Sequence, residues 1–89
     1  MAAHNLTPGQ LLYITKLDAA PCNAYAVVDR VDFYATMRTI EGKTPNGYSE
    51  GYLLGDSGDT WRVVDYSVLS KEGRRKLMVF RLTGELPDV

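Results

Sequence analysis

Residues 47–69, GYSEGYLLGDSGDTWRVVDYSVL, decide the fold class of this 89-residue chain. Two runs rich in tyrosine, leucine and valine lie on either side of the glycine- and aspartate-rich segment 55–59. In the second run the side chains alternate, with Trp61, Val63 and Asp65 on one face and Arg62, Val64 and Tyr66 on the other. Alternation of this kind on both sides of a turn is typical of paired antiparallel strands. The stretch therefore predicts two strands joined by a tight turn.

The letters GDSG at 55–58 also surround the nucleophile of chymotrypsin-like serine proteases. A nucleophilic serine needs a nearby base, a carboxylate that orients the base and an oxyanion hole. The only histidine is His4, at the start of the chain, and Asp59 stands where the protease signature has a second glycine. Gly55 and Gly58 allow positive φ angles, and the aspartates can hydrogen-bond nearby backbone groups. We interpret the segment as a turn and expect no catalytic site and no enzymatic activity.

The remaining segments extend the β pattern. Residues 10–17 predict a strand with two partly apolar faces, although a capping box at Thr7 leaves a helix open. Residues 24–40 predict a half-buried strand, bent or bulged near 29–32, with a helix over 32–41 as the alternative. Asn46-Gly47 favours a hairpin that pairs residues 34–41 with 48–54. Further turns are expected at 18–23 and 71–74, and RKLMVFRLT, residues 75–83, predicts a last strand.

These elements predict a mainly β single domain over residues 1–89, with flexible tails at 1–6 and 86–89. An isolated flat sheet of this size could not bury an apolar face, so it must curl. We expect a five-stranded antiparallel meander or an SH3-like barrel, or an α+β variant in which one short helix crosses the sheet.

Composition excludes several classes of site. One cysteine and one histidine cannot form a disulfide or a tetrahedral structural zinc site, so no metal and no cofactor are expected. The chain has no apolar run of membrane-spanning length and no secretory signal pattern, which predicts a cytoplasmic protein without membrane contact. The lone thiol, Cys22, has no evident base, and we interpret it as unreactive.

The six tyrosines suggest a function in binding. Tyrosine is rigid and amphipathic, and it is enriched at protein interfaces. The candidate protein-binding residues are Tyr34, Tyr48, Glu50 and Tyr52, which the predicted hairpin brings together. The leading hypothesis is a non-catalytic adaptor or inhibitor that binds a larger protein, as a monomer or homodimer. Small accessory proteins of bacteriophages and plasmids have this size.

The alternative is a small β-barrel that binds nucleic acid. Residues 1–59 carry four basic and seven acidic side chains, whereas residues 60–89 carry six and four, so the later part is net positive. The sequence KEGRRK at 71–76 would place cations at a hairpin tip, where they contact phosphates while an aromatic ring stacks on a base. The residues predicted for this site are Arg62, Tyr66, Lys71, Arg74, Arg75, Lys76 and Arg81.

Overall fold

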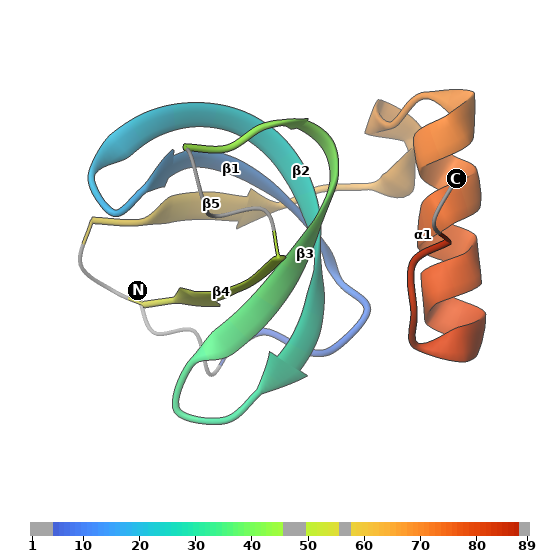
Figure 1. Ribbon diagram of the computed structural model, residues 1–89, viewed down its shortest axis with the longest axis horizontal. Coiled ribbons are helices and arrows are strands. Elements are labelled where there is room, and N and C mark those ends of the chain that lie inside the picture. Colours follow the sequence, from blue (N-terminus) through green and yellow to red (C-terminus); the bar gives the residue numbers. More distant parts are fainter. Residues whose placement is uncertain (1–4, 46–49, 56–57, 88–89) are drawn as a thin grey trace.

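A computed structural model describes residues 5–45, 50–55 and 58–87 and has one curled antiparallel sheet with a helix beside it (Figure 1). The strands are β1 (Leu11–Leu17), β2 (Ala20–Val31), β3 (Ala35–Lys43), β4 (Glu50–Leu54) and β5 (Thr60–Val63). A short 3-10 helix, η2 (Tyr66–Val68), and an α-helix, α1 (Lys71–Thr83), follow. The mainly β fold with one helix is therefore as predicted from the sequence.

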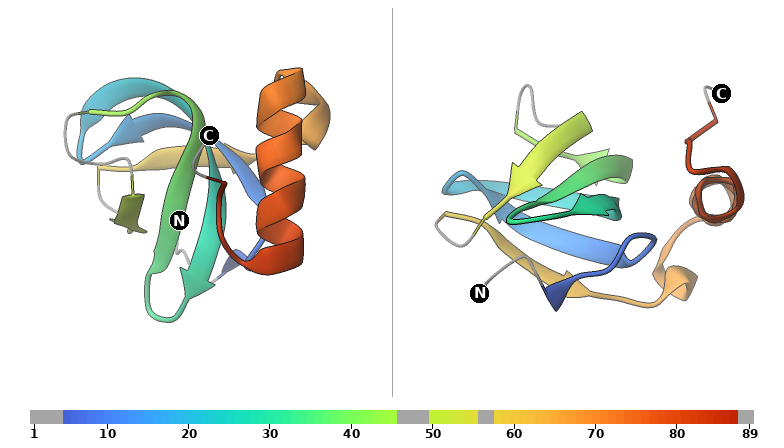
Figure 2. Two further views of the ribbon diagram at one scale, coloured as in Figure 1. Left: turned by 45° about the vertical axis from the view of Figure 1, so that its right-hand side comes forward. Right: turned by 90° about the horizontal axis from the view of Figure 1, so that it is seen from below.

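The sheet curls into a half-barrel because its last strand returns to its first. The strand order is β4-β3-β2-β1-β5, and every neighbouring pair is antiparallel. Irregular pairings along β1, β2 and β3 increase the bend of the long strands. Figure 2 shows the resulting bowl of strands, with α1 standing outside it. The predicted pairing of residues 34–41 with 48–54 is confirmed by the β3–β4 pairs. The predicted pairing of the two strands on either side of segment 55–59 is wrong, because β4 and β5 lie at opposite edges of the sheet and β5 pairs with β1.

Two apolar clusters lie on the two faces of the central strands. Alternate residues of β1 separate them: Leu12 and Ile14 point into the bowl, whereas Leu11 points outward. The inner cluster contains Leu6, Leu12, Ile14, Leu17, Ala26, Val28, Ala35, Met37 and Leu54. The outer cluster contains Leu11, Val27, Ile40, Leu69, Leu77 and Phe80. The expectation that both faces of residues 10–17 are apolar and buried is confirmed.

The helix α1 covers the outer face of the sheet. Gly73, Leu77 and Phe80 are its buried residues, and their spacing of four and three places them on one side of a helix. The side chain of Ser70 accepts a hydrogen bond from the Gly73 amide at the N-terminal cap, and Gly84 ends the helix with φ of 82°. Burial of Leu77 and Phe80 contributes about 1.5–3 kcal/mol each. The helix is therefore the second layer that the outward-facing apolar residues require.

The turn between β1 and β2 is held by the segment before β5. Asp18 and Ala19 both have positive φ, 51° and 65°, as in a two-residue hairpin turn. The Asp18 amide donates to Asp59 Oδ1 at 2.7 Å, and the Ala19 amide donates to the Gly58 carbonyl. Asp59 Oδ2 also accepts from the Gly55 amide at 2.9 Å. The described residues of the GDSGD segment, Gly55, Gly58 and Asp59, thus have a structural role.

The prediction of one strand over residues 24–40 is wrong, although the bulge or bend expected near 29–32 is confirmed. The segment forms the end of β2, a bend at Asp32–Tyr34 and the start of β3. Phe33, which lies within the predicted strand, is 92% exposed at the tip of this β2–β3 hairpin. An irregularity between Val28 and Arg30 shifts the alternation before the bend, so one period could not fit the whole run.

The prediction of a strand over residues 75–83 and of a turn at 71–74 is also wrong, because both lie in α1. The helix alternatives considered for residues 7–17 and 32–41 are wrong, because Leu11–Leu17 and Ala35–Lys43 are strands and residues 32–34 form a bend. Residues 60–69 form a strand only as far as Val63, and Tyr66 lies in η2. The apolar residues of RKLMVFRLT fit both the two-residue period of a strand and the 3.6-residue period of a helix. Contact with the outer face of the sheet selects the helix.

Leu6 and Leu86, which were assigned to the expected tails, contact the core. Leu6 is 7% exposed and belongs to the inner cluster, and Leu86 packs against the outer cluster. His4, Tyr48 and Ser57 lie outside the described residues, as do the side chain of Glu50 and the Asn46-Gly47 turn. In the part of the chain that is described, no helix has the length and apolarity to cross a membrane.

Candidate functional site

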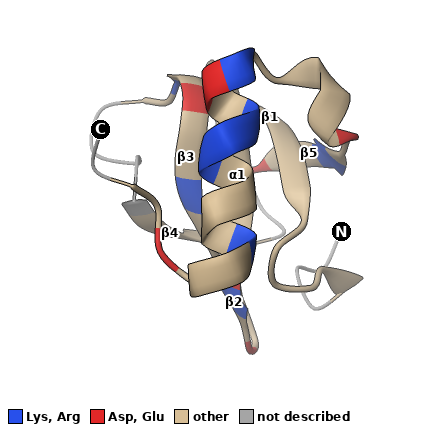
Figure 3. Cartoon of the chain, turned by 90° about the vertical axis from the view of Figure 1, so that its right-hand side faces the viewer, with Lys and Arg blue, Asp and Glu red and all other residues tan. Residues whose placement is uncertain are grey.

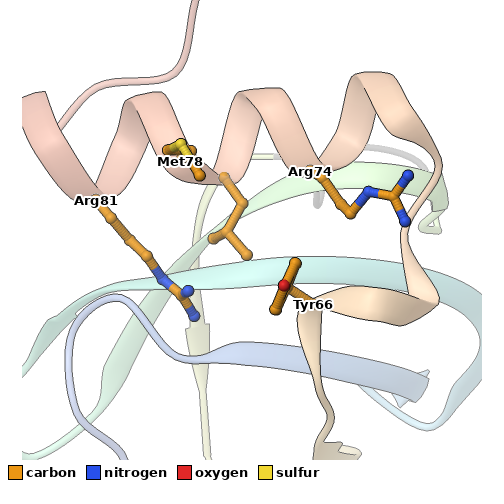
Figure 4. Close-up of a pocket in the computed structure, with 5 residues that line it drawn as sticks. Tyr66, Arg74, Met78 and Arg81 are labelled. Carbon is orange, nitrogen blue, oxygen red and sulfur yellow. The ribbon is translucent and has the colours of Figure 1, made fainter.

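A groove between η2 and α1 is the main candidate site. Tyr66 of η2 forms one wall, and Arg74, Leu77, Met78 and Arg81 of α1 form the other (Figure 4). Its volume is about 300 Å³. Tyr66 is 51% exposed and Met78 is 63% exposed, so two large apolar surfaces face solvent here. We call these five residues the helix groove.

Hydrogen bonds at the N-terminal caps fix the starts of η2 and α1, the two helices that form the walls of the groove. The side chain of Asp65 accepts from the Ser67 amide at 3.3 Å and begins η2. The side chain of Ser70 begins α1, and Glu41 of β3 binds both the amide and the hydroxyl of Ser70. The carboxylate of Glu41 lies so close to Gly73 that a Cβ there would overlap it. The contact of Glu41 with Ser70 therefore fixes the start of α1, which forms one wall of the groove, against the sheet.

The two arginines of the groove differ in their bonding. Nε of Arg81 donates to the Gly9 carbonyl at 3.0 Å, which fixes this side chain. The guanidinium of Arg74 makes no hydrogen bond or ion pair with any of the described residues. Figure 4 shows the two guanidinium groups on opposite sides of the Tyr66 ring. The groove thus offers an apolar floor between two cations, one of them held in place.

The charge of α1 differs from that of the rest of the chain. The helix has five basic side chains and one acidic one, a charge of +4, whereas the whole chain has −1, which leaves −5 for the remainder. Figure 3 shows the basic positions along α1. Glu72 is bound by Arg75, with 2.5 Å between Arg75 Nη2 and Glu72 Oε2, and this hydrogen bond lowers the pKa of Glu72. A hydrogen bond from Ser67 similarly lowers the pKa of Asp65, with a smaller contribution from the charge of Arg81.

The residues predicted for nucleic-acid binding lie in different parts of the structure. Tyr66, Arg74 and Arg81 come together in the helix groove. Lys71, Arg75 and Lys76 lie on α1 but do not line the groove. Arg62 lies on β5, with its guanidinium carbon 5.0 Å from the centre of the Tyr13 ring. The cations therefore follow a helix and not the hairpin tip that we expected.

Two of the tyrosines predicted for protein binding, Tyr34 and Tyr52, differ in their exposure to solvent. Tyr52 is half-buried against the inner cluster, and its hydroxyl donates to Asp59 Oδ1 at 3.3 Å. Tyr34 is 56% exposed, in the bend between β2 and β3. It lies beside Phe33 and Leu53, which are 92% and 52% exposed. We call Phe33, Tyr34 and Leu53 the hairpin-tip patch.

Sequence interpretation missed Leu77 and Met78 in the groove and Phe33 and Leu53 in the hairpin-tip patch. A signal for the first pair was present: Ser70 and Gly84 are a helix start and stop around residues whose buried members follow helical spacing. No comparable signal marks Phe33, because exposure of a phenylalanine in a bend depends on where the strands end.

The environment of Cys22 disfavours reaction of its thiol. Its thiol donates to the Ile14 carbonyl at 3.3 Å. Burial raises the pKa of Cys22, and the negative charge of Asp59 raises it further. A raised pKa keeps the group in the thiol form, which is the poor nucleophile.

No protein-family model matches the chain, and no curated protein or solved structure matches it significantly.

Proposed function

We propose that this chain is a non-catalytic module that binds a segment of a larger protein in the helix groove. The observation that carries the proposal is the exposure of Met78 and Tyr66 over an apolar floor between Arg74 and Arg81. Neither Met78 nor Tyr66 belongs to the apolar clusters of the core, so stability does not explain them. Clustered exposed apolar side chains with a polar rim are a common feature of protein-binding sites.

The chemistry of the groove indicates the kind of segment. Methionine adapts its shape to different apolar side chains, and tyrosine offers a flat ring and a hydroxyl. Arg74 and Arg81 are seven residues apart, which is about 10 Å along a helix axis. A segment with an apolar side chain between two carboxylates would match this arrangement. Because α1 is basic, it would also attract such a segment from a distance.

Site-specific photo-crosslinking from residue 78 tests the proposal in extracts of the native host. We expect a discrete adduct that unlabelled wild-type protein displaces. The captured protein is then purified, and its affinity is measured for the variants Arg74→Glu and Met78→Asp. Each should weaken binding by about tenfold or more, since hot-spot truncations and introduced like charges cost over 1 kcal/mol.

The matched control is Lys71→Glu, which makes the same change of charge on the same helix outside the groove. It should alter affinity only slightly and mainly through the association rate. The proposal fails if residue 78 yields no displaceable adduct, or if Lys71→Glu weakens binding as much as Arg74→Glu does.

Binding of single-stranded nucleic acid is a second candidate. The position of the Tyr66 ring between two guanidinium groups favours it, because bases stack on aromatic rings while cations contact phosphates. The aliphatic and thioether surface of Leu77 and Met78 favours a protein ligand instead. Titration with a fluorescent oligothymidylate separates the two. Affinity that falls steeply with salt and is lost in Tyr66→Ala would support nucleic acid, whereas no saturable binding would remove it.

A further inference from the structure

The hairpin-tip patch lies apart from the helix groove and is formed by different elements. Its most exposed member is Phe33, in a bend where the Asp32 amide donates to the Tyr34 carbonyl at 2.9 Å. Short bends between strands usually contain glycine, asparagine or aspartate. A phenylalanine that is 92% exposed contributes nothing to the core and increases the apolar surface in contact with water. Together with the exposed Tyr34 and Leu53 it forms an apolar patch, and patches of this kind are typical of contact surfaces.

A hollow beside this patch could receive an aromatic side chain. Its volume is about 270 Å³, and its lining residues are Arg30, Asp32, Phe33, Tyr34, Thr36 and Leu53. The hollow thus combines apolar surface from β4 and the bend with one positive and one negative side chain from β2 and the bend.

The two charges in the hollow indicate the occupant. Asp29, their neighbour, is paired with Arg38 at 3.5 Å. Arg30 and the Asp32 carboxylate make no ion pair with each other or with any other described residue. A strongly acidic or basic partner would meet one like charge. In a two-fold pair of copies that places Arg30 of one against Asp32 of the other, this favourable contact forms twice, because residue i contacts j and j contacts i.

We propose that the chain forms a two-fold homodimer through the hairpin-tip patch. Phe33 of each copy occupies the hollow of the other, and Arg30 of one copy pairs with Asp32 of the second. This inference is independent of the proposed function. It leaves both helix grooves accessible in different parts of the dimer, which would let the dimer bind a repeated partner with two contacts.

Sedimentation equilibrium of the purified full chain over a wide range of protein concentration tests the dimer. Wild type should dissociate reversibly between dimer and monomer. Phe33→Ser should remain monomeric, because it removes the group that fills the hollow. The matched control is Leu82→Ser, which changes an 80% exposed apolar residue of α1 that does not line the hollow, and it should associate like wild type. Far-UV circular dichroism establishes that each variant is folded.

Charge reversal tests the predicted pairing. Arg30→Asp and Asp32→Arg, tested singly, should each weaken association by about tenfold or more, because like charges then face each other twice in the interface. The double variant Arg30→Asp with Asp32→Arg should restore association to near the wild-type level. A wild-type monomer at every concentration overturns the proposal, as does a dimer that survives Phe33→Ser. Failure of the double variant to recover overturns the two-fold pairing.

Discussion

The carboxylate of Glu41 in β3 occupies the space where residue 73 of α1 would carry a Cβ atom. Gly73 is buried, and Glu41 binds the amide and hydroxyl of Ser70 one turn earlier. A carboxylate at a helix N-terminus also interacts favourably with the helix dipole. Glycine at position 73 thus leaves the space for the contact between Glu41 and Ser70 that joins the sheet to the helix. Glycine inside a helix is otherwise unfavourable.

Replacement of Gly73 by alanine should therefore destabilise the protein. The methyl group displaces Glu41 from Ser70, and the lost charged hydrogen bonds outweigh the gain in helix propensity, for a net loss of about 1 kcal/mol. In a Glu41→Ala background the same change should become neutral or stabilising by up to about 1 kcal/mol, because only the propensity remains. Urea unfolding of the four proteins of this cycle measures the coupling. Stabilisation by Gly73→Ala in the wild-type background would contradict the proposed contact.

Asp59 should be the most sensitive residue of the GDSGD segment. Its carboxylate accepts hydrogen bonds from the Asp18 amide, the Gly55 amide and the Tyr52 hydroxyl. Asp59→Ala should lower the free energy of unfolding by about 2–3 kcal/mol, since it removes three hydrogen bonds to a carboxylate. Asp59→Asn should have a smaller effect, because one acceptor oxygen remains. Glu85→Ala, at an exposed site, is the control and should change stability little; an equal loss there would refute the role assigned to Asp59.

Ala19 should gain from replacement by glycine. It is exposed and has φ of 65°, a region that costs an L-residue about 1–2 kcal/mol. Relief of this strain, less the larger backbone entropy of glycine in the unfolded chain, predicts stabilisation by about 0.5–1 kcal/mol and a Tm higher by a few degrees. Ala20→Gly, one residue later in β2, should destabilise, because Ala20 has no positive φ. Thermal unfolding distinguishes the two, and identical shifts would argue against the turn geometry.

Cys22 should react slowly while the protein is folded. Burial and the charge of Asp59 raise the pKa of its thiol, so the thiolate is scarce at neutral pH and its fraction rises only at a pH above that of an ordinary cysteine. Because Cys22 is the single cysteine, the rate of alkylation by iodoacetamide reports this site alone. Urea should accelerate the reaction, and so should Asp59→Asn in the folded state. An alkylation rate unchanged by unfolding would contradict the assigned environment.

Local turn chemistry and alternation were sufficient to predict the β1 strand, the β3–β4 pairing and the mainly β class. They failed at three places for different physical reasons. The strands on either side of segment 55–59 do not pair, because β5 pairs with β1 at the opposite edge of the sheet from β4. Between Val28 and Ala35 an irregular pairing and a bend change which face each residue occupies, and this depends on the partner strand. Over residues 71–83 the sequence satisfies both periods, and the uncovered outer cluster of the sheet decides for the helix.

The candidate site was predicted only in part for the same reason. Tyr66, Arg74 and Arg81 were selected for their chemistry and do meet, but on helices rather than strands. Leu77 and Met78 could be placed beside them only once α1 was known. Of the tyrosines, Tyr34 is exposed as required, whereas Tyr52 packs inward and bonds to Asp59, a distinction that alternation alone cannot make.

The central structural claim is that residues 71–83 form a helix that packs on the outer face of β1, β2 and β3 and forms one wall of the groove. Backbone chemical shifts and nuclear Overhauser effects in solution test this most directly. We predict helical Cα shifts over Lys71–Thr83, with contacts from Leu77 and Phe80 to Leu11 and Val27. Extended-strand shifts for residues 75–83, with cross-strand contacts to β5, would contradict the claim and remove the groove on which the proposed function depends.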